Sequence, residues 1–111
     1  MIQTVGPRDA EALIASGEVD VVDVREVREW STGHIPGARL VPLEKLRADP
    51  GRALPRDNVV FVCAKGSRSL SAAKLAERLG WSRLYNLDGG TSGWAKAGLP
   101  LARGNSLDAA G

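Results

Sequence analysis

The sequence has few of the residues that build disulfides and metal centres. Its 111 residues include one cysteine, Cys63, and one histidine, His34. A single thiol cannot form a disulfide within the chain, and a histidine without a cysteine or acidic cluster at ligand spacing does not indicate a metal site. We therefore expect no metal and no cofactor. The lone thiol fits a reducing compartment, which favours a cytoplasmic location.

Long hydrophobic runs and a strong charge of one sign are also missing. The longest apolar run covers residues 59–64, far short of the roughly 20 residues that span a bilayer. The start of the chain has no basic segment followed by an apolar core, so we expect no signal peptide. A net charge of +2 is too mild for a nucleic-acid surface. We expect neither a membrane nor a nucleic acid as partner.

The sequence does contain an alternation of apolar strands and amphipathic helices. The clearest strand is predicted at residues 58–63, with others at 4–5, 19–24, 39–41 and 84–87. Helical patterns lie between them at residues 10–14, 27–30, 43–46, 72–79 and 91–97. Such alternation predicts an open three-layer α/β fold, with a mainly parallel sheet of about five strands and helices on both faces.

One folded domain is predicted over residues 1–101. Residues 102–111 are small and polar and are expected to form a flexible C-terminal tail. Residues 47–57, which contain two prolines and a glycine, are predicted to be a surface loop.

The best candidate for chemistry lies where the strongest strand ends. Cys63 ends that strand, and Ala64-Lys65-Gly66-Ser67-Arg68 leads into a helix predicted from about Ser69. In open α/β sheets, ligands bind beyond the carboxyl ends of the strands. A loop curled around the sulfur would aim its N–H groups inward, Gly66 permits that curl, and Lys65 and Arg68 add positive charge. These features favour a reactive thiolate; the alternative is a small buried hydrophobe.

Four blocks of the sequence resemble rhodanese domains. The loop Cys63-Ala64-Lys65-Gly66-Ser67-Arg68, with Ser69 and Ala72-Ala73 after it, resembles the family's active-site loop and helix. The other blocks occur in the family order, over about residues 2–101: Asp23-Val24-Arg25; Glu29-Trp30 with residues 33–38; and residues 87–90 with Trp94 and residues 98–100. The resemblance implies the three-layer rhodanese-like fold.

The resemblance also implies a mechanism. The Cys63 thiolate would take a sulfane sulfur from a donor such as thiosulfate and pass it, as a persulfide, to cyanide or a thiol. Loop N–H groups would stabilise the persulfide, and Lys65 and Arg68 would orient an anionic donor, with Arg68 the better candidate because of its bidentate geometry. Four residues separate Cys63 from Arg68, as in rhodaneses. Related phosphatases have a loop that is one residue longer, which argues against phosphatase activity.

Several alternatives remain beside this prediction. Asp23 and Arg25 end a neighbouring strand, and we expect them to order loops by hydrogen bonding rather than to catalyse. His34 is expected to make a structural hydrogen bond. Gly89 and Gly90 are expected to form a turn into the last helix rather than a phosphate loop. The whole domain could instead be a sulfur-relay module that exchanges persulfide sulfur with a protein partner, or a non-catalytic binding domain.

Overall fold

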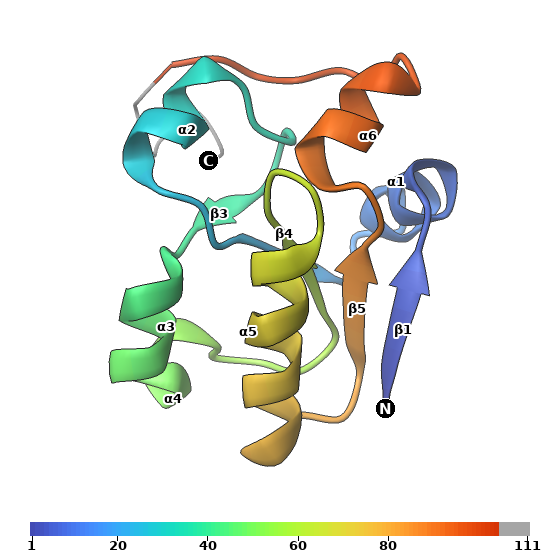
Figure 1. The fold of residues 1–111 in the computed structure, drawn as a ribbon. Helices are drawn as coiled ribbons and strands as arrows, with labels where there is room; N and C mark the ends of the chain where they lie inside the picture. Colours follow the sequence, from blue (N-terminus) through green and yellow to red (C-terminus); the bar gives the residue numbers. More distant parts are fainter. Residues whose placement is uncertain (105–111) are drawn as a thin grey trace.

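A parallel sheet of five strands in the order β1-β5-β4-β2-β3 forms the centre of the computed structural model, which describes residues 1–104 (Figure 1). The strands are β1 (Ile2–Val5), β2 (Asp20–Asp23), β3 (Arg39–Leu40), β4 (Val59–Val62) and β5 (Leu84–Leu87). β4 pairs with β2 on one side and β5 on the other, and all its residues are buried. An uninterrupted apolar strand suits this place because helices cover both faces of a parallel sheet. The predicted three-layer α/β fold is confirmed.

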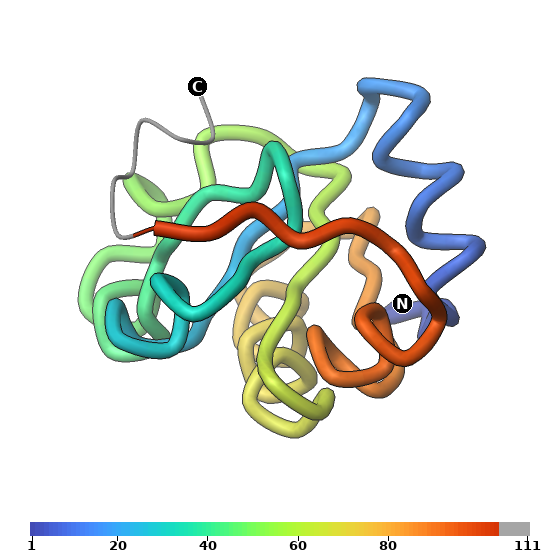
Figure 2. Tube along the Cα trace, turned by 90° about the horizontal axis from the view of Figure 1, so that it is seen from above, coloured from blue at the N-terminus to red at the C-terminus, as the bar shows by residue number. Residues whose placement is uncertain are grey.

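The residues of β4 alternate between two hydrophobic cores, one on each face of the sheet. Val59 and Phe61 pack in the core that includes side chains of α3 (Leu43–Ala48), α4 (Pro50–Ala53) and α5 (Ser67–Arg78). Val60 and Val62 pack in the core that includes side chains of α1 (Pro7–Ala15), α2 (Val27–Thr32) and α6 (Gly90–Lys96). Viewed from above, α1 and α5 lie on opposite sides of the strands (Figure 2). Helix α5, which follows the Cys63 loop, is thereby fixed against one face.

Two sequence predictions are wrong in detail. Residues 47–57 are not all loop, because α3 continues to Ala48 and the short helix α4 follows. Asp49 caps α4 by accepting a hydrogen bond from the amide of Arg52, and Pro50 fits a first helical turn, where no amide partner is needed. The active-site helix begins at Ser67 rather than Ser69. Gly66 takes the N-cap position with a φ of 111°, so the loop is shorter than expected.

The last described residues run alongside the segment after α2 (Figure 2). The amide of Ala102 donates to the carbonyl of His34 at 2.8 Å, and the amide of His34 donates back at 2.9 Å. Gly104 donates its amide hydrogen to the carbonyl of Ser31 at 3.1 Å. The chain is therefore held at the start of the predicted tail, and residues 105–111 lie outside the described residues. Within residues 1–104, no helix is both long and apolar enough to cross a bilayer.

Candidate active site

The loop after β4 curls around the sulfur of Cys63. Of the predicted residues, Ala64, Lys65 and Gly66 lie between the end of the central strand and the start of α5, and Ser67 and Arg68 are the first two residues of that helix. The amide of Gly66 points inward and donates to Sγ of Cys63 at 3.1 Å. Where the loop enters α5, Gly66 has a positive φ, which a residue with a Cβ adopts only at a cost. An inward-pointing amide is one feature of the anion nest that the sequence predicts.

The surroundings of the sulfur favour its thiolate form. Burial acts to raise the pKa of the Cys63 thiol, because the residue is only 1% exposed. The hydrogen bond with the Ser69 hydroxyl and the hydrogen bonds from the amides of Ser69, Gly66 and Lys65 outweigh burial, so the pKa of Cys63 lies below its ordinary value. A lowered pKa gives more of the nucleophilic thiolate at neutral pH.

A hydrogen-bonded pair behind the sulfur was not foreseen from the sequence. Ser69 Oγ lies 3.3 Å from Sγ of Cys63 and donates its hydrogen to Oδ1 of Asn86 on β5 at 2.5 Å. Nδ2 of Asn86 donates to the carbonyl of Gly66 at 3.2 Å. Asn86 therefore positions both the loop and the serine. Its one signal in the sequence is a polar side chain within an otherwise apolar strand.

The start of α6 holds the loop from the other side. The amide of Thr91 donates to the carbonyl of Cys63 at 2.9 Å, and the amide of Ser92 donates to the carbonyl of Ala64 at 3.1 Å. Gly89 and Gly90 form the predicted turn into this helix, with φ values of 74° and 58°. A Cβ on Gly90 would collide with the carbonyl groups of Cys63 and Ala64. The glycine is needed for the close approach of two backbones, which the sequence prediction of a turn did not anticipate.

Asp23 and Arg25 lie at the carboxyl end of β2, next to the loop strand. Nε of Arg25 donates to Oδ1 and Oδ2 of Asp23 at 3.0 and 3.1 Å, and Nη2 donates to Oδ2 at 2.8 Å. Nη2 also donates to the carbonyl of Gly33 at 2.7 Å, where α2 has ended. Both side chains are at most 5% exposed. These contacts fit the predicted role of ordering loops.

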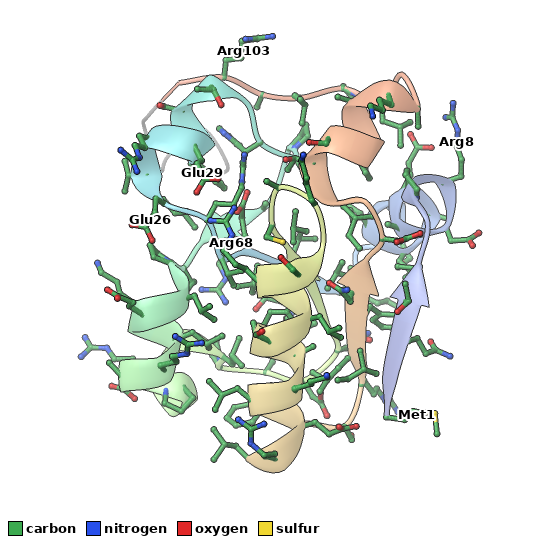
Figure 3. The ribbon with its side chains drawn as sticks, in the orientation of Figure 1. Met1, Arg8, Glu26, Glu29, Arg68 and Arg103 are labelled. Carbon is green, nitrogen blue, oxygen red and sulfur yellow. The ribbon has the colours of Figure 1, made fainter. Side chains whose placement is uncertain are left out.

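Two predicted cations of the loop lie in different settings. Lys65 is exposed and makes no ion pair among residues 1–104. Arg68 reaches from α5 to Glu29 in α2 (Figure 3), where Nη1 donates to Oε1 at 2.8 Å and Nη2 to Oε2 at 2.9 Å. The hydrogen bond from Arg68 lowers the pKa of Glu29 from its ordinary 4.5 to about 2. The partner of Arg68 was not foreseen from the sequence.

His34 is fully buried and takes no part in this site. Its Nδ1 lies 2.9 Å from the carbonyl oxygen of Trp30, and the two rings stack with their centroids 3.6 Å apart. The predicted structural hydrogen bond is therefore present. Within residues 1–104, no group of three or more His, Cys, Asp or Glu side chains could hold a metal ion.

Comparison with known proteins identifies a family for this chain. A sequence model of the rhodanese-like domain matches residues 6–97. Thiosulfate sulfurtransferase GlpE of Pseudomonas fluorescens is 41% identical over 91 residues, which cover 81% of this chain and 82% of that protein. A rhodanese-related protein from Thermoplasma volcanium has a similar structure, with a TM-score of 0.79, 29% identity and coverage of 90% of this chain and 97% of that one.

One relative is much longer than this chain. Probable adenylyltransferase/sulfurtransferase MoeZ of Mycobacterium tuberculosis is 36% identical over 100 residues, which cover 87% of this chain but 26% of that protein. The chain thus spans about a quarter of that relative, and only the matched part supports an argument about it. The match over residues 6–97 and the shared fold show that this chain belongs to the rhodanese-like domain family, which includes sulfurtransferases.

Proposed function

We propose that this chain is a sulfurtransferase that moves a sulfane sulfur from a donor such as thiosulfate to cyanide or a thiol, through a persulfide on Cys63. The observation that carries the proposal is the amide of Gly66 aimed at Sγ of Cys63 at 3.1 Å, inside a loop with the family's spacing. The sulfurtransferase relatives support sulfur transfer in general, and the thiosulfate in the name of one of them suggests the donor.

The reaction has two steps of the ping-pong type. The thiolate of Cys63 forms a bond to the outer sulfur of thiosulfate, and the bond between that sulfur and the sulfonate sulfur breaks. Sulfite leaves with the electron pair of that bond. Cyanide or a thiolate then bonds to the outer sulfur of the persulfide, the bond to Sγ breaks, and the thiolate of Cys63 returns. Neither step requires an oxidant, a reductant or a cofactor.

The loop supports both steps by holding negative charge. The amide of Gly66 already donates to the sulfur, and the amides of Lys65 and Ser69 lower the pKa of the thiol. The same donors would stabilise the persulfide anion, as an oxyanion hole stabilises an oxyanion. Lys65 is exposed beside the loop and would attract an anionic donor.

We also propose a reducing location such as the cytoplasm, because the only cysteine has to cycle through a free thiolate.

A protein that carries a persulfide is a second candidate for donor or acceptor. One observation favours it: Glu29 already holds both terminal nitrogens of Arg68, the cation best suited to grip a sulfonate.

Steady-state kinetics test the proposal. Thiocyanate formation is measured while thiosulfate and cyanide are varied, and the proposal predicts parallel double-reciprocal lines. Cys63→Ser should abolish turnover, whereas Ser71→Ala, a change at an exposed serine of α5, should leave turnover unchanged. Thiocyanate formation by Cys63→Ser at the wild-type rate would refute the proposal.

A further inference from the structure

The guanidinium group of Arg68 is paired with a carboxylate of α2 through both of its terminal nitrogens. Its two terminal nitrogens face the two oxygens of Glu29 at 2.8 and 2.9 Å, a bidentate arrangement (Figure 3). The side chains of Arg68 and Glu29 are 38% and 31% exposed, so solvent reaches the pair from one side. The fork that would grip the sulfonate group of a donor is occupied by the protein's own carboxylate.

Glu29 is anchored from a second direction. Its Oε1 also accepts a hydrogen bond from the amide of Glu26 at 3.1 Å, and the side chain of Glu26 accepts in return from the amide of Glu29. This reciprocal capping box fixes the start of α2. A donor that displaced Glu29 from Arg68 would have to compete with an anchored carboxylate rather than with a freely rotating one.

The other cations near the sulfur leave little free positive charge. Arg25 is buried against Asp23, so that pair carries no net charge. Arg68 is near enough to the sulfur that the charge of Cys63 adds to the effect of Glu29 in raising the pKa of Arg68. Lys65 is the cation of the loop that has no ion-pair partner within residues 1–104.

We propose that Glu29 sets the donor specificity of this site: by neutralising Arg68, it favours sulfur donors with one negative charge, such as thiosulfonates and persulfides, over dianionic thiosulfate. The proposal rests on the function proposed above and names the charge class of its donor. A second negative charge on the donor is repelled by the carboxylate of Glu29 and cannot form an ion pair with the guanidinium of Arg68, which Glu29 already occupies.

Methanethiosulfonate is the probe that isolates charge. It is a monoanion whose outer sulfur is bonded to a sulfonyl group, as in thiosulfate. The Cys63 thiolate would bond to that outer sulfur, the bond to the sulfonyl sulfur would break, and methanesulfinate would leave with the electron pair. The product is the same persulfide on Cys63. The two donors differ in that a methyl group replaces one sulfonate oxygen, which removes one negative charge, and in the leaving group that results.

The test compares kcat/KM for thiosulfate with kcat/KM for methanethiosulfonate in wild type and Glu29→Gln. Glutamine retains an oxygen that can accept from the amide of Glu26, so the start of the helix is preserved. The ratio of thiosulfate to methanethiosulfonate should rise about fivefold to tenfold in Glu29→Gln and fall back at high salt. Glu26→Gln removes an equal charge that is not paired with Arg68 and should leave the ratio unchanged.

A second pair of variants keeps the test decisive if Glu29→Gln folds poorly. Arg68→Gln leaves Glu29 without its partner, so the ratio should fall below the wild-type value. In the double variant Glu29→Gln with Arg68→Gln, the two side chains again carry no net charge together, as in wild type. Its ratio of thiosulfate to methanethiosulfonate should therefore return towards the wild-type value.

Two results would overturn the inference and separate it from the proposed function. An unchanged ratio in all the variants, with sulfur still transferred, overturns the role of Glu29 alone. Failure of both donors to place sulfur on Cys63 of folded wild type overturns the proposed function and this inference with it.

Discussion

Ser69 donates its only hydroxyl hydrogen to Asn86, with 2.5 Å between the two oxygens. The same hydroxyl oxygen lies 3.3 Å from Sγ of Cys63. Because a hydroxyl has one hydrogen, Ser69 cannot donate to Asn86 and to the sulfur at the same time. While Ser69 donates its hydrogen to Asn86, the Cys63 thiol is the donor to the Ser69 oxygen. To stabilise the thiolate, the Ser69 hydroxyl has to rotate and donate to the sulfur instead. Ionisation of Cys63 is therefore coupled to the hydrogen bond between Ser69 and Asn86.

Ser69→Ala should raise the pKa of Cys63. The side-chain hydrogen bond of Ser69 is the largest of the effects that lower that pKa, and alanine cannot supply it. Below the pKa, the thiolate fraction falls about tenfold per pH unit, so persulfide formation should begin to fail at a higher pH than in wild type. Ultraviolet absorbance of the thiolate, followed over pH, measures the shift.

Ser71→Ala is the control for this change, because Ser71 is exposed and, within residues 1–104, its hydroxyl bonds only to the carbonyl of Ser67 on the same helix. It should leave the titration unchanged. An identical titration curve for Ser69→Ala and wild type would contradict the assigned role of Ser69.

Gly90→Ala should disrupt the active-site loop from the α6 side. A Cβ there would collide with backbone carbonyl groups of Cys63 and Ala64, which cannot move aside as a flexible side chain can. The left-handed backbone at this position adds strain to that collision. We therefore expect a loss of about 2–4 kcal/mol in the free energy of unfolding. Urea denaturation measures it.

Gly51→Ala is the matched glycine control, since a Cβ at Gly51 meets nothing within 4 Å and the residue lies in α4. Its free energy of unfolding should stay within about 1 kcal/mol of wild type. Equal stability of Gly90→Ala and Gly51→Ala would argue against the close approach of α6 to the loop.

Arg25→Met should destabilise the fold strongly. The change leaves the carboxylate of Asp23 buried and unpaired, and the carbonyl of Gly33 loses its donor. Breaking one side of a buried ion pair typically costs about 3–5 kcal/mol. Chemical denaturation monitored by tryptophan fluorescence measures the loss in the free energy of unfolding.

Arg8→Met is the control. It breaks an exposed ion pair with Glu11 and should lower the free energy of unfolding by less than about 1 kcal/mol. Similar losses of stability for both variants would refute the importance of the buried pair.

The sequence predicted the chemistry-bearing loop better than the contacts that hold it. β4 is apolar throughout and Gly66 follows closely, so the strand end, the curl and the position of Cys63 could all be predicted locally. Glu29 and Asn86 could not be assigned in the same way. Glu29 meets Arg68 across 39 residues and Asn86 meets Ser69 across 17, and no local pattern states which distant polar side chains come together. Pro50 misled the prediction because proline also suits the first turn of a helix.

The stability of the protein should depend on Asp57 in acid. Partial burial acts to raise the pKa of this carboxyl, but hydrogen bonds from Ser82, Arg83 and Asn58 lower it from the ordinary 3.8 to about 2. Because the pKa of Asp57 is lower in the folded than in the unfolded protein, its carboxylate stabilises the fold at pH values above the unfolded pKa. This contribution is lost as the pH falls through about 2, the folded pKa.

Asp57→Asn should therefore weaken the fold at neutral pH by about 1 kcal/mol, a figure discounted for the solvent exposure of this carboxyl. It should also flatten the fall in stability between pH 4 and 2, in part only, because Glu29 titrates in the same range. Thermal melts over a pH series measure the slope, and a slope as steep as that of wild type would contradict the assignment.

The most direct test of the central claim is the intact mass of the protein after incubation with a sulfur donor, in separate arms for thiosulfate and methanethiosulfonate. A persulfide cycle on Cys63 predicts a gain of one sulfur atom that disappears when a thiol acceptor is added and never forms in Cys63→Ser. The methanethiosulfonate arm should reach full modification at the lower donor concentration. A folded wild-type protein that gains no sulfur from either donor, or a Cys63→Ser protein that gains as much as wild type, would contradict the account.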